Sequence, residues 1–94
     1  MELIKNAAAG TLESGDIMIE ISPGQSKLTV DLKSPVERMF GEQIRTAIEA
    51  AAIECGVHSG EIRAIDMGAL DCVIRARVIT AIYRAAGRDD FQFK

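Results

Sequence analysis

The chain has 94 residues, 48% of them hydrophobic and 27% charged, and a formal net charge of −3. This length suits a single domain, residues 1–94, and leaves little room for a deep catalytic cleft beside the core. The few aromatic residues and the lack of a long basic run exclude a nucleic-acid partner, because bases need stacking surfaces and phosphates need cations. No apolar stretch approaches the ~18 residues of a membrane span, and the first residues do not resemble a signal peptide. We therefore expect a cytoplasmic protein that has no membrane contact.

The first third of the sequence predicts strands within residues 9–32. Residues 16–21 and 27–32 both alternate between polar and apolar side chains, the pattern of strands with one buried face. Residues 22–26, Ser-Pro-Gly-Gln-Ser, have turn composition and would separate the two strands. The apolar positions expected to face the core are Ile17, Ile19, Ile21, Leu28, Val30 and Leu32.

Ser14 and Gly15 lie between a weaker strand, residues 9–13, and the strand that starts at Asp16. A two-residue loop with glycine between extended runs predicts a tight hairpin with Ser14 at its tip. An exposed hydroxyl on a fixed backbone is what a post-translational attachment site needs, and Gly15 supplies the positive φ of a turn and room beside the serine. The same dipeptide is common in ordinary turns, so the local sequence leaves both interpretations open.

The first helix is predicted to follow the strands. Ser34 and Glu37 form a capping box, and Pro35 suits the first helical position. Gly56 is the expected stop, and residues 61–66 then predict a fourth strand with imperfect alternation. The apolar stripe of this helix comprises Val36, Phe40, Ile44, Ala47, Ile48, Ala51 and Cys55.

Residues 70–86 predict a second helix, which is apolar on two sides. The second side is either a docking surface for a larger subunit or a further buried face of the helix. The element order β-β-β-α-β-α predicts an α+β fold, a two-layer sandwich in which two helices cover a mainly antiparallel sheet. The first stripe comprises Leu70, Ile74, Val78, Ala81 and Ala85, and the second comprises Cys72, Ala76, Ile79, Tyr83 and Ala86.

The residue types that usually carry catalysis or bind metals are scarce. Cys55, Cys72 and the single histidine, His58, are too few for a zinc site, and the cysteines are expected to be buried free thiols. Arg75 and Arg77 point in different directions on a helix, so they do not form one phosphate clamp. There is no phosphate-binding glycine loop and no nucleophile–histidine arrangement, so we expect a non-catalytic protein without a metal.

Residues 9–19 read Ala-Gly-Thr-Leu-Glu-Ser-Gly-Asp-Ile-Met-Ile. A second segment, residues 68–72, reads Gly-Ala-Leu-Asp-Cys and continues into Ile-Arg-Ala-Arg at residues 74–77. Together with residues 40–45 of the first predicted helix, these segments resemble the acyl carrier protein of citrate lyase, its gamma subunit. The resemblance covers most of the chain in the same order. Residues 22–33 and the tail after Gly87 match less well.

In that family, the serine of the Leu-Glu-Ser-Gly-Asp stretch carries phosphoribosyl-dephospho-CoA through a phosphodiester. The resemblance therefore implies that Ser14 is the covalent attachment site and that Gly15 and Asp16 belong to the same cofactor-binding segment. It also implies that the thiol of the arm bears acetyl and citryl groups between a transferase (alpha) subunit and a lyase (beta) subunit. A dedicated prosthetic-group transferase would install the arm.

Two alternatives remain open. The carrier subunit of malonate decarboxylase uses the same type of prosthetic group. An unmodified scaffold subunit would need only an exposed apolar surface, and it would tolerate Ser14→Ala. Carriers of fatty-acid or peptide synthesis match less well, because they resemble four-helix domains with the serine at a helix start, whereas Ser14 lies between predicted strands.

Overall fold

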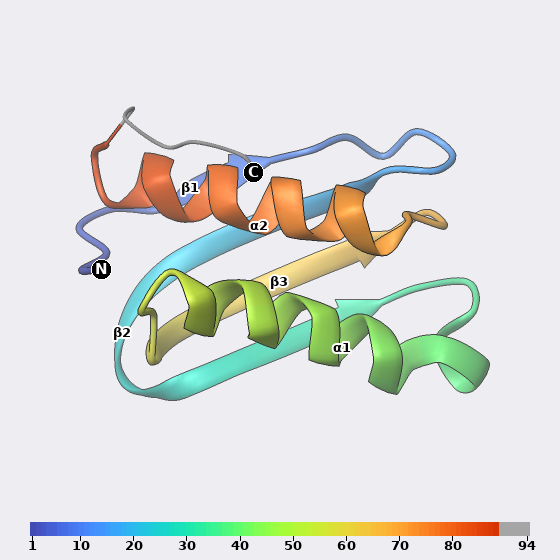
Figure 1. The fold of residues 1–94 in the computed structure, drawn as a ribbon, viewed down its shortest axis with the longest axis horizontal. Coiled ribbons are helices and arrows are strands. Elements are labelled where there is room, and N and C mark those ends of the chain that lie inside the picture. The colour runs from blue at the N-terminus through green and yellow to red at the C-terminus, as the bar shows by residue number, and fades with distance from the viewer. Residues whose placement is uncertain (89–94) are drawn as a thin grey trace.

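The computed structural model describes residues 1–88 and shows an α+β fold of two layers (Figure 1). Both helices lie on the same face of the sheet, and α2 packs against α1, β1 and β2. The predicted fold class is therefore confirmed. The elements are β1 (Ala7–Ala9), β2 (Ile17–Lys33), α1 (Glu37–Glu54), β3 (Ser59–Asp66) and α2 (Asp71–Ala85).

Strand β2 is a single long strand whose two halves pair with opposite edges of β3. From Ile17 to Ser22 it runs antiparallel to β3, starting with the pair Ile17 and Asp66. The strand then bends around the start of β3, on the left of Figure 1. In the second half, Leu28 lies beside Gly60, and the paired numbers rise together along both segments. This half therefore runs in the direction of β3, which α1 makes possible by crossing back over the sheet.

The structure corrects one detail of the strand prediction and keeps the element order. Residues 22–26 were expected to form a separate turn, but they continue β2, since the chain curves around β3 and does not fold back on itself. When the two halves of β2 are counted separately, the order is β-β-β-α-β-α, as predicted. Strand β1 pairs antiparallel with the first half of β2, so most of the pairing is antiparallel.

The core lies between the sheet and the two helices, as the alternating patterns predict. Burial of branched aliphatic side chains is the main source of stability in such a layer. Leu28 and Val30 are only half-buried, because they lie on the part of β2 that forms the edge of the sheet. The largest fully buried apolar side chains are Ile17, Ile19, Ile21, Ile48, Ile62, Ile74, Ile82, Val57 and Val78.

Strand β3 alternates more regularly than its sequence suggests. Gly60, Ile62, Ala64 and Asp66 all face inward, and Ile65 faces outward. The alternation looks imperfect in the sequence because the apolar Ile65 falls opposite Ile62 and Ala64, and the structure shows that the inward position beyond Ala64 is taken by a carboxylate, Asp66. Asp66 is 1% exposed, and it is the one buried charged side chain among residues 1–88.

The start of α1 differs from the prediction. Ser34 Oγ accepts a hydrogen bond from Val36 N (3.2 Å), but the helix begins only at Glu37, and no side chain caps it. The predicted apolar stripe is buried at Ile44, whereas Val36 and Phe40 are 38% and 42% exposed. The reason is visible in Figure 1, where the first turns of α1 extend past the end of the sheet and have no strand beneath them.

Helix α2 is buried on two sides only in its second half. Ile79 of the second stripe is buried, whereas Tyr83 is half-buried and Cys72 is exposed. The predicted burial of Cys72 is therefore wrong, and Cys55 is only half-buried, although both thiols are free as expected. Leu70, predicted to join the first stripe, lies just before the helix and is exposed. No helix within residues 1–88 is long and apolar enough to cross a membrane.

Each edge of the sheet receives one arginine from a helix. Arg84 of α2 donates a hydrogen bond from Nη1 to the carbonyl oxygen of Ala8 in β1 (2.7 Å). Arg45 of α1 donates from Nη1 to the carbonyl oxygen of Val30 in the second half of β2 (2.6 Å). Each arginine therefore ties a helix to a backbone carbonyl of a strand at one margin of the sheet.

Candidate functional site

Ser14 lies in the connection between β1 and β2, at the right-hand end of the molecule in Figure 1. The backbone N–H of Asp16 donates to the carbonyl of Glu13 (3.1 Å), so Ser14 and Gly15 are the central residues of a turn. Gly15 has φ +86°, the conformation that a type II turn requires at its third position. Ser14 is exposed, as the sequence predicts.

The connection is longer than the predicted tight hairpin. Strand β1 ends at Ala9, and residues 10–13, expected to be extended, do not belong to a strand. The cause is Gly10, which adopts φ +102° where a Cβ atom would lie 1.8 Å from the carbonyl oxygen of Ile17. The chain therefore leaves the ladder at Gly10 and forms a seven-residue loop, residues 10–16.

The turn that holds Ser14 is fixed to the loop after β3. Gly15 N donates to Met67 O (2.7 Å), and Met67 N donates to Asp16 O (2.9 Å), which extends the β2–β3 pairing past its last regular pair. No atom lies within 4 Å of the position where a Cβ on Gly15 would be. The backbone beside Ser14 is therefore held in place while the space around its hydroxyl stays open.

Asp16 fastens the other side of the turn. Its carboxylate forms a bidentate pair with Arg77 of α2, with Nε to Oδ1 at 3.0 Å and Nη2 to Oδ2 at 2.8 Å. Thr11 Oγ1 donates to Oδ2 (2.7 Å), and Ile17 N donates to Oδ1 (2.7 Å). Hydrogen bonds from Arg77, then from Thr11 and Ile17, hold the pKa of Asp16 well below its ordinary value. The carboxylate is thus ionised and fully engaged in positioning the loop.

Sequence reasoning missed Arg77 and Met67 as partners of this loop. Arg77 is 61 positions from Asp16, and nothing in the local pattern pairs them. The prediction that Arg75 and Arg77 point in different directions is confirmed, since Arg75 instead forms a bidentate pair with Glu54 of α1. The available hint was that Arg77 ends the second segment of the family resemblance. Met67 offers only backbone contacts, which no sequence pattern reveals.

The buried Asp66 connects three loops at the same end of the molecule. Ser34 Oγ, just before α1, donates to Asp66 Oδ2 (2.9 Å), and Ala69 N, just before α2, donates to Asp66 Oδ1 (2.9 Å). The next residue, Met67, bonds to the Ser14 turn. One carboxylate therefore fixes the entrance to α1 and the entrance to α2 relative to Ser14.

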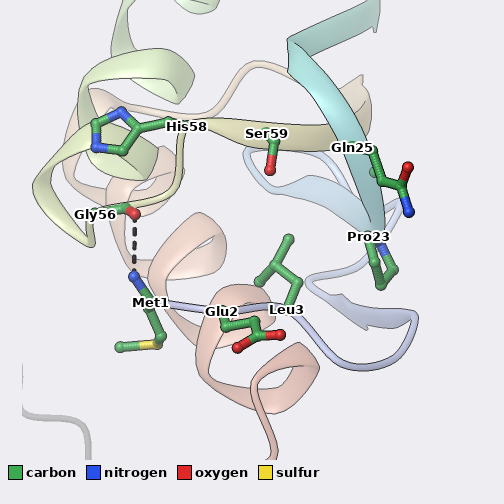
Figure 2. Close-up of a pocket in the computed structure, with 9 residues that line it drawn as sticks. Met1, Glu2, Leu3, Pro23, Gln25, Gly56, His58 and Ser59 are labelled. Carbon is green, nitrogen blue, oxygen red and sulfur yellow. Dashed lines mark hydrogen bonds between the residues drawn. The ribbon is translucent and has the colours of Figure 1, made fainter.

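A hollow lies at the opposite end of the molecule, and Figure 2 shows the side chains around it. Its volume is about 590 Å³, and its titratable side chains are Glu2 and His58. These two lie on different sides of the hollow in Figure 2, where the Met1 amine also donates to Gly56 O (3.0 Å). The arrangement places no nucleophile beside a base, and His58 is an exposed loop residue, as expected.

Other chemical groups in residues 1–88 do not assemble a second site. No three histidine, cysteine or acidic side chains of this part of the chain approach one another closely enough to hold a metal ion. Burial raises the pKa of the half-buried Cys55 thiol, which makes it a poor nucleophile. The Ser14 turn is therefore the best-defined candidate site in the described chain.

The sequence matches a known family profile and named relatives. The sequence profile of the family described as malonate decarboxylase delta subunit (MdcD) matches residues 4–85. The chain is 47% identical over 94 residues to citrate lyase acyl carrier proteins of Streptococcus uberis and Latilactobacillus sakei, covering all of this chain and 93% of each relative. The corresponding protein of Streptococcus mutans is 45% identical over 95 residues.

A solved structure shares the fold. It is the crystal structure of a Pseudomonas malonate decarboxylase hetero-tetramer in complex with malonate, with a TM-score of 0.73 and 22% sequence identity. The match covers 86% of this chain and 84% of that chain. Since the relatives align over all of this chain and 93% of their own length, and the profile spans every helix and strand, the chain belongs to the citrate lyase acyl carrier protein family.

Proposed function

We propose that Ser14 carries a phosphoribosyl-dephospho-CoA arm, joined to its hydroxyl through a phosphodiester. The observation that supports this most directly is an exposed serine on a turn whose backbone is bonded to the body of the protein through Gly15 and Met67. A modifying enzyme needs to reach the oxygen, and a bulky group needs free space, which the open surroundings of Gly15 offer. The residues present therefore fit the group.

The three residues of the proposed attachment segment have different tasks. Ser14 provides the oxygen for the covalent bond. Gly15 supplies the backbone conformation that turns the serine outward and leaves the space beside it open. Asp16 holds no part of the arm in this proposal, because its carboxylate is engaged by Arg77, Thr11 and Ile17 N. Its task is to orient the turn.

When attached, the arm supplies a terminal thiol on which acetyl and citryl groups are held as thioesters. The protein contributes the tether and its fixed origin. A group on a tether meets the active sites of an assembly at a high effective concentration, so each transfer proceeds without a new diffusional encounter. The curated relatives are named acyl carrier proteins, which supports a non-catalytic carrier role for this chain. In this proposal, other subunits carry out the chemistry of citrate cleavage.

The partners in this proposal are a transferase (alpha) subunit, a lyase (beta) subunit and a prosthetic-group transferase, in the cytoplasm. The names of the curated relatives support a place in citrate lyase, and the fold neighbour belongs to a hetero-tetramer. The malonate decarboxylase alternative has the support of the family profile and that neighbour, but the neighbour is 22% identical and the citrate lyase carriers are 47% identical. Identity therefore favours citrate lyase.

Intact mass spectrometry of the protein from its native host, grown by fermenting citrate, tests the proposal. We expect a mass increase equal to phosphoribosyl-dephospho-CoA, and we expect Ser14→Ala to abolish it. The matched control is Ser26→Ala, an exposed serine on the bend of β2, which should keep the adduct. An unmodified protein under these conditions would support the scaffold alternative. An adduct that carries malonyl and no acetyl or citryl group would support malonate decarboxylase.

A further inference from the structure

Large apolar side chains are exposed mainly at the end of the molecule that holds Ser14. Nine such side chains are exposed within residues 1–88, and six of them belong to the three loops joined through Asp66 or to the first turns of α1. The other three, Ile4, Ile53 and Ile65, lie on the N-terminal segment, the last turn of α1 and the outer face of β3. The six are Leu12, Val36, Met39, Phe40, Met67 and Leu70, which we call the apolar end face.

The apolar end face is held in a fixed position relative to Ser14. Asp66 bonds to Ser34 before α1 and to Ala69 before α2, and Met67 bonds to the turn of Ser14. In Figure 1 the three connections reach the same right-hand end of the molecule. A contact made on this face therefore also determines where the origin of the arm is placed.

The exposure of these side chains is informative because a small protein that folds alone usually covers its largest apolar groups. Met39 is 79% exposed and Leu70 is 71% exposed. Single exposed apolar residues are common, but a cluster at one end beside the proposed functional residue marks an interaction surface. Covering it would remove unfavourable contact with water.

The charges around the face identify the kind of partner. Glu13, Glu42 and Asp71 are acidic and have no ion-pair partner among residues 1–88. Arg38 and Lys33, the last residue of β2, are basic and also have no ion-pair partner in this part of the chain, so three negative and two positive charges leave −1. Glu42 and Asp71 line one groove between α1 and α2. The proposed arm adds phosphate charges of the same sign at Ser14. A partner that covers this face needs apolar residues at the centre and basic residues around them.

We propose that the apolar end face docks the carrier onto the catalytic subunits that it serves, at an apolar entrance surrounded by basic side chains. This inference rests on the proposed function, since it is the arm that would enter there. It adds that docking is a property of the protein surface and occurs without the arm. A second copy of this chain is a poorer occupant, because it would bring two acidic margins together.

Binding of the unmodified chain tests the inference. The Ser14→Ala protein, which has no attachment oxygen, is immobilised, and the co-purified transferase and lyase subunits of the same citrate lyase are the probe in biolayer interferometry. Met39→Glu and Leu70→Glu, each added separately, should weaken binding at least about tenfold, as charges do at the centre of an interface. The matched control is Ile53→Glu, which is 57% exposed on the opposite end of the same helix and should leave binding unchanged.

Several outcomes would overturn the inference. They are equal weakening by Met39→Glu and Ile53→Glu, no effect of both end-face variants, or no binding of the Ser14→Ala chain to its subunits. Loss of a dimer in sedimentation with unchanged subunit binding would assign the face to a second copy. Circular dichroism melting verifies that each variant is folded. The proposed function fails separately, through the absence of an adduct on the unsubstituted protein, so the two failures are distinguishable.

Discussion

The two ends of the molecule are built in opposite ways. At the Ser14 end, three loops are joined by hydrogen bonds that converge on the buried Asp66 and on Met67, and large apolar side chains remain on the surface. At the other end, the chain leaves a hollow between the N-terminal segment, the bend of β2 and the loop around His58. There the Met1 amine donates hydrogen bonds to the carbonyl oxygens of Cys55 (3.3 Å) and Gly56 (3.0 Å).

The difference shows that a loop can have a firmly fixed backbone and still expose apolar side chains on its surface. Loops are usually the more mobile and less constrained parts of a fold. At the Ser14 end, the buried carboxylate of Asp66 and the bidentate ion pair between Asp16 and Arg77 hold the loops in place. The apolar side chains that project from those loops remain exposed to contact another molecule. At the hollow end, the titratable side chains of Glu2 and His58 form no hydrogen bond or ion pair with other residues of the described part of the chain, 1–88.

The strongest test of this comparison removes the buried carboxylate. Asp66→Ala leaves the hydroxyl of Ser34 and the N–H of Ala69 without their acceptor, so we expect a loss of about 3 kcal/mol in the free energy of unfolding. Glu2→Ala at the hollow end should change it by less than about 0.5 kcal/mol, because Glu2 is exposed. Urea unfolding measures both. Equal effects at the two ends would remove the distinction between them.

The two glycines of the Ser14 loop offer a second, smaller test. Gly10→Ala should destabilise the protein by about 2 kcal/mol or more, because its Cβ would collide with the carbonyl of Ile17 in addition to the strained φ. Gly15→Ala meets only open space and should lose about 1 kcal/mol from the left-handed backbone alone. Thermal unfolding of the two variants ranks them. A larger loss at Gly15 would mean that the turn is packed more tightly than the structure shows.

The smallest expected effect concerns the ion pair between Asp16 and Arg77. Asp16→Asn should reduce the free energy of unfolding by about 1 kcal/mol at pH 7, a modest value because the Arg77 side chain is 40% exposed. The folded-state pKa of Asp16 lies below its unfolded value of about 4, so this stabilisation is present above that pH and is lost as the pH falls below it. The difference in stability between the two proteins should therefore shrink as the pH falls from about 4 toward the folded-state pKa of Asp16.

The control for this pH test is Glu49→Gln, an exposed position in the middle of α1. Its stability should follow that of the unsubstituted protein at every pH. The contrary outcome is a free energy of unfolding of Asp16→Asn that differs from that of the unsubstituted protein by the same amount down to pH 2. That result would mean that the Asp16 side chain acts through packing or neutral hydrogen bonds, and that the charge of Arg77 does not contribute.

Much of the fold could be predicted because its core follows simple periodicity. The alternation of Ile17, Ile19 and Ile21 and the helical stripes through Ile44 and Ile74 correctly identified the buried faces. The continuous path of β2 could not be predicted, because Ser-Pro-Gly-Gln-Ser is as compatible with a tight turn as with a bend around another strand. That choice depends on where β3 lies, which is a tertiary property.

Only the exposed part of the site, the turn of Ser14 and Gly15, was predictable from the sequence. The exposed turn of Ser14 and Gly15 follows from local turn chemistry. The burial of Asp66 does not, since a carboxylate at an inward position of a strand breaks the apolar alternation from which burial is inferred. The partnership of Asp16 with Arg77 joins residues that are far apart in the sequence, and the position of Gly10 requires knowing that Ile17 lies beside it.

The arginines at the two margins of the sheet affect how readily the protein could aggregate by backbone pairing at high concentration. A strand margin with free carbonyls is a template on which another polypeptide can add by backbone pairing, the first step of amyloid-like growth. Arg84 occupies the carbonyl of Ala8 on one margin, and Arg45 occupies the carbonyl of Val30 on the other. At the β1 margin, an extended segment would have to displace the Arg84 guanidinium before it could pair with the carbonyl of Ala8. A molecule whose large apolar side chains are exposed at one end thus makes backbone pairing less favourable at this position of its β1 margin.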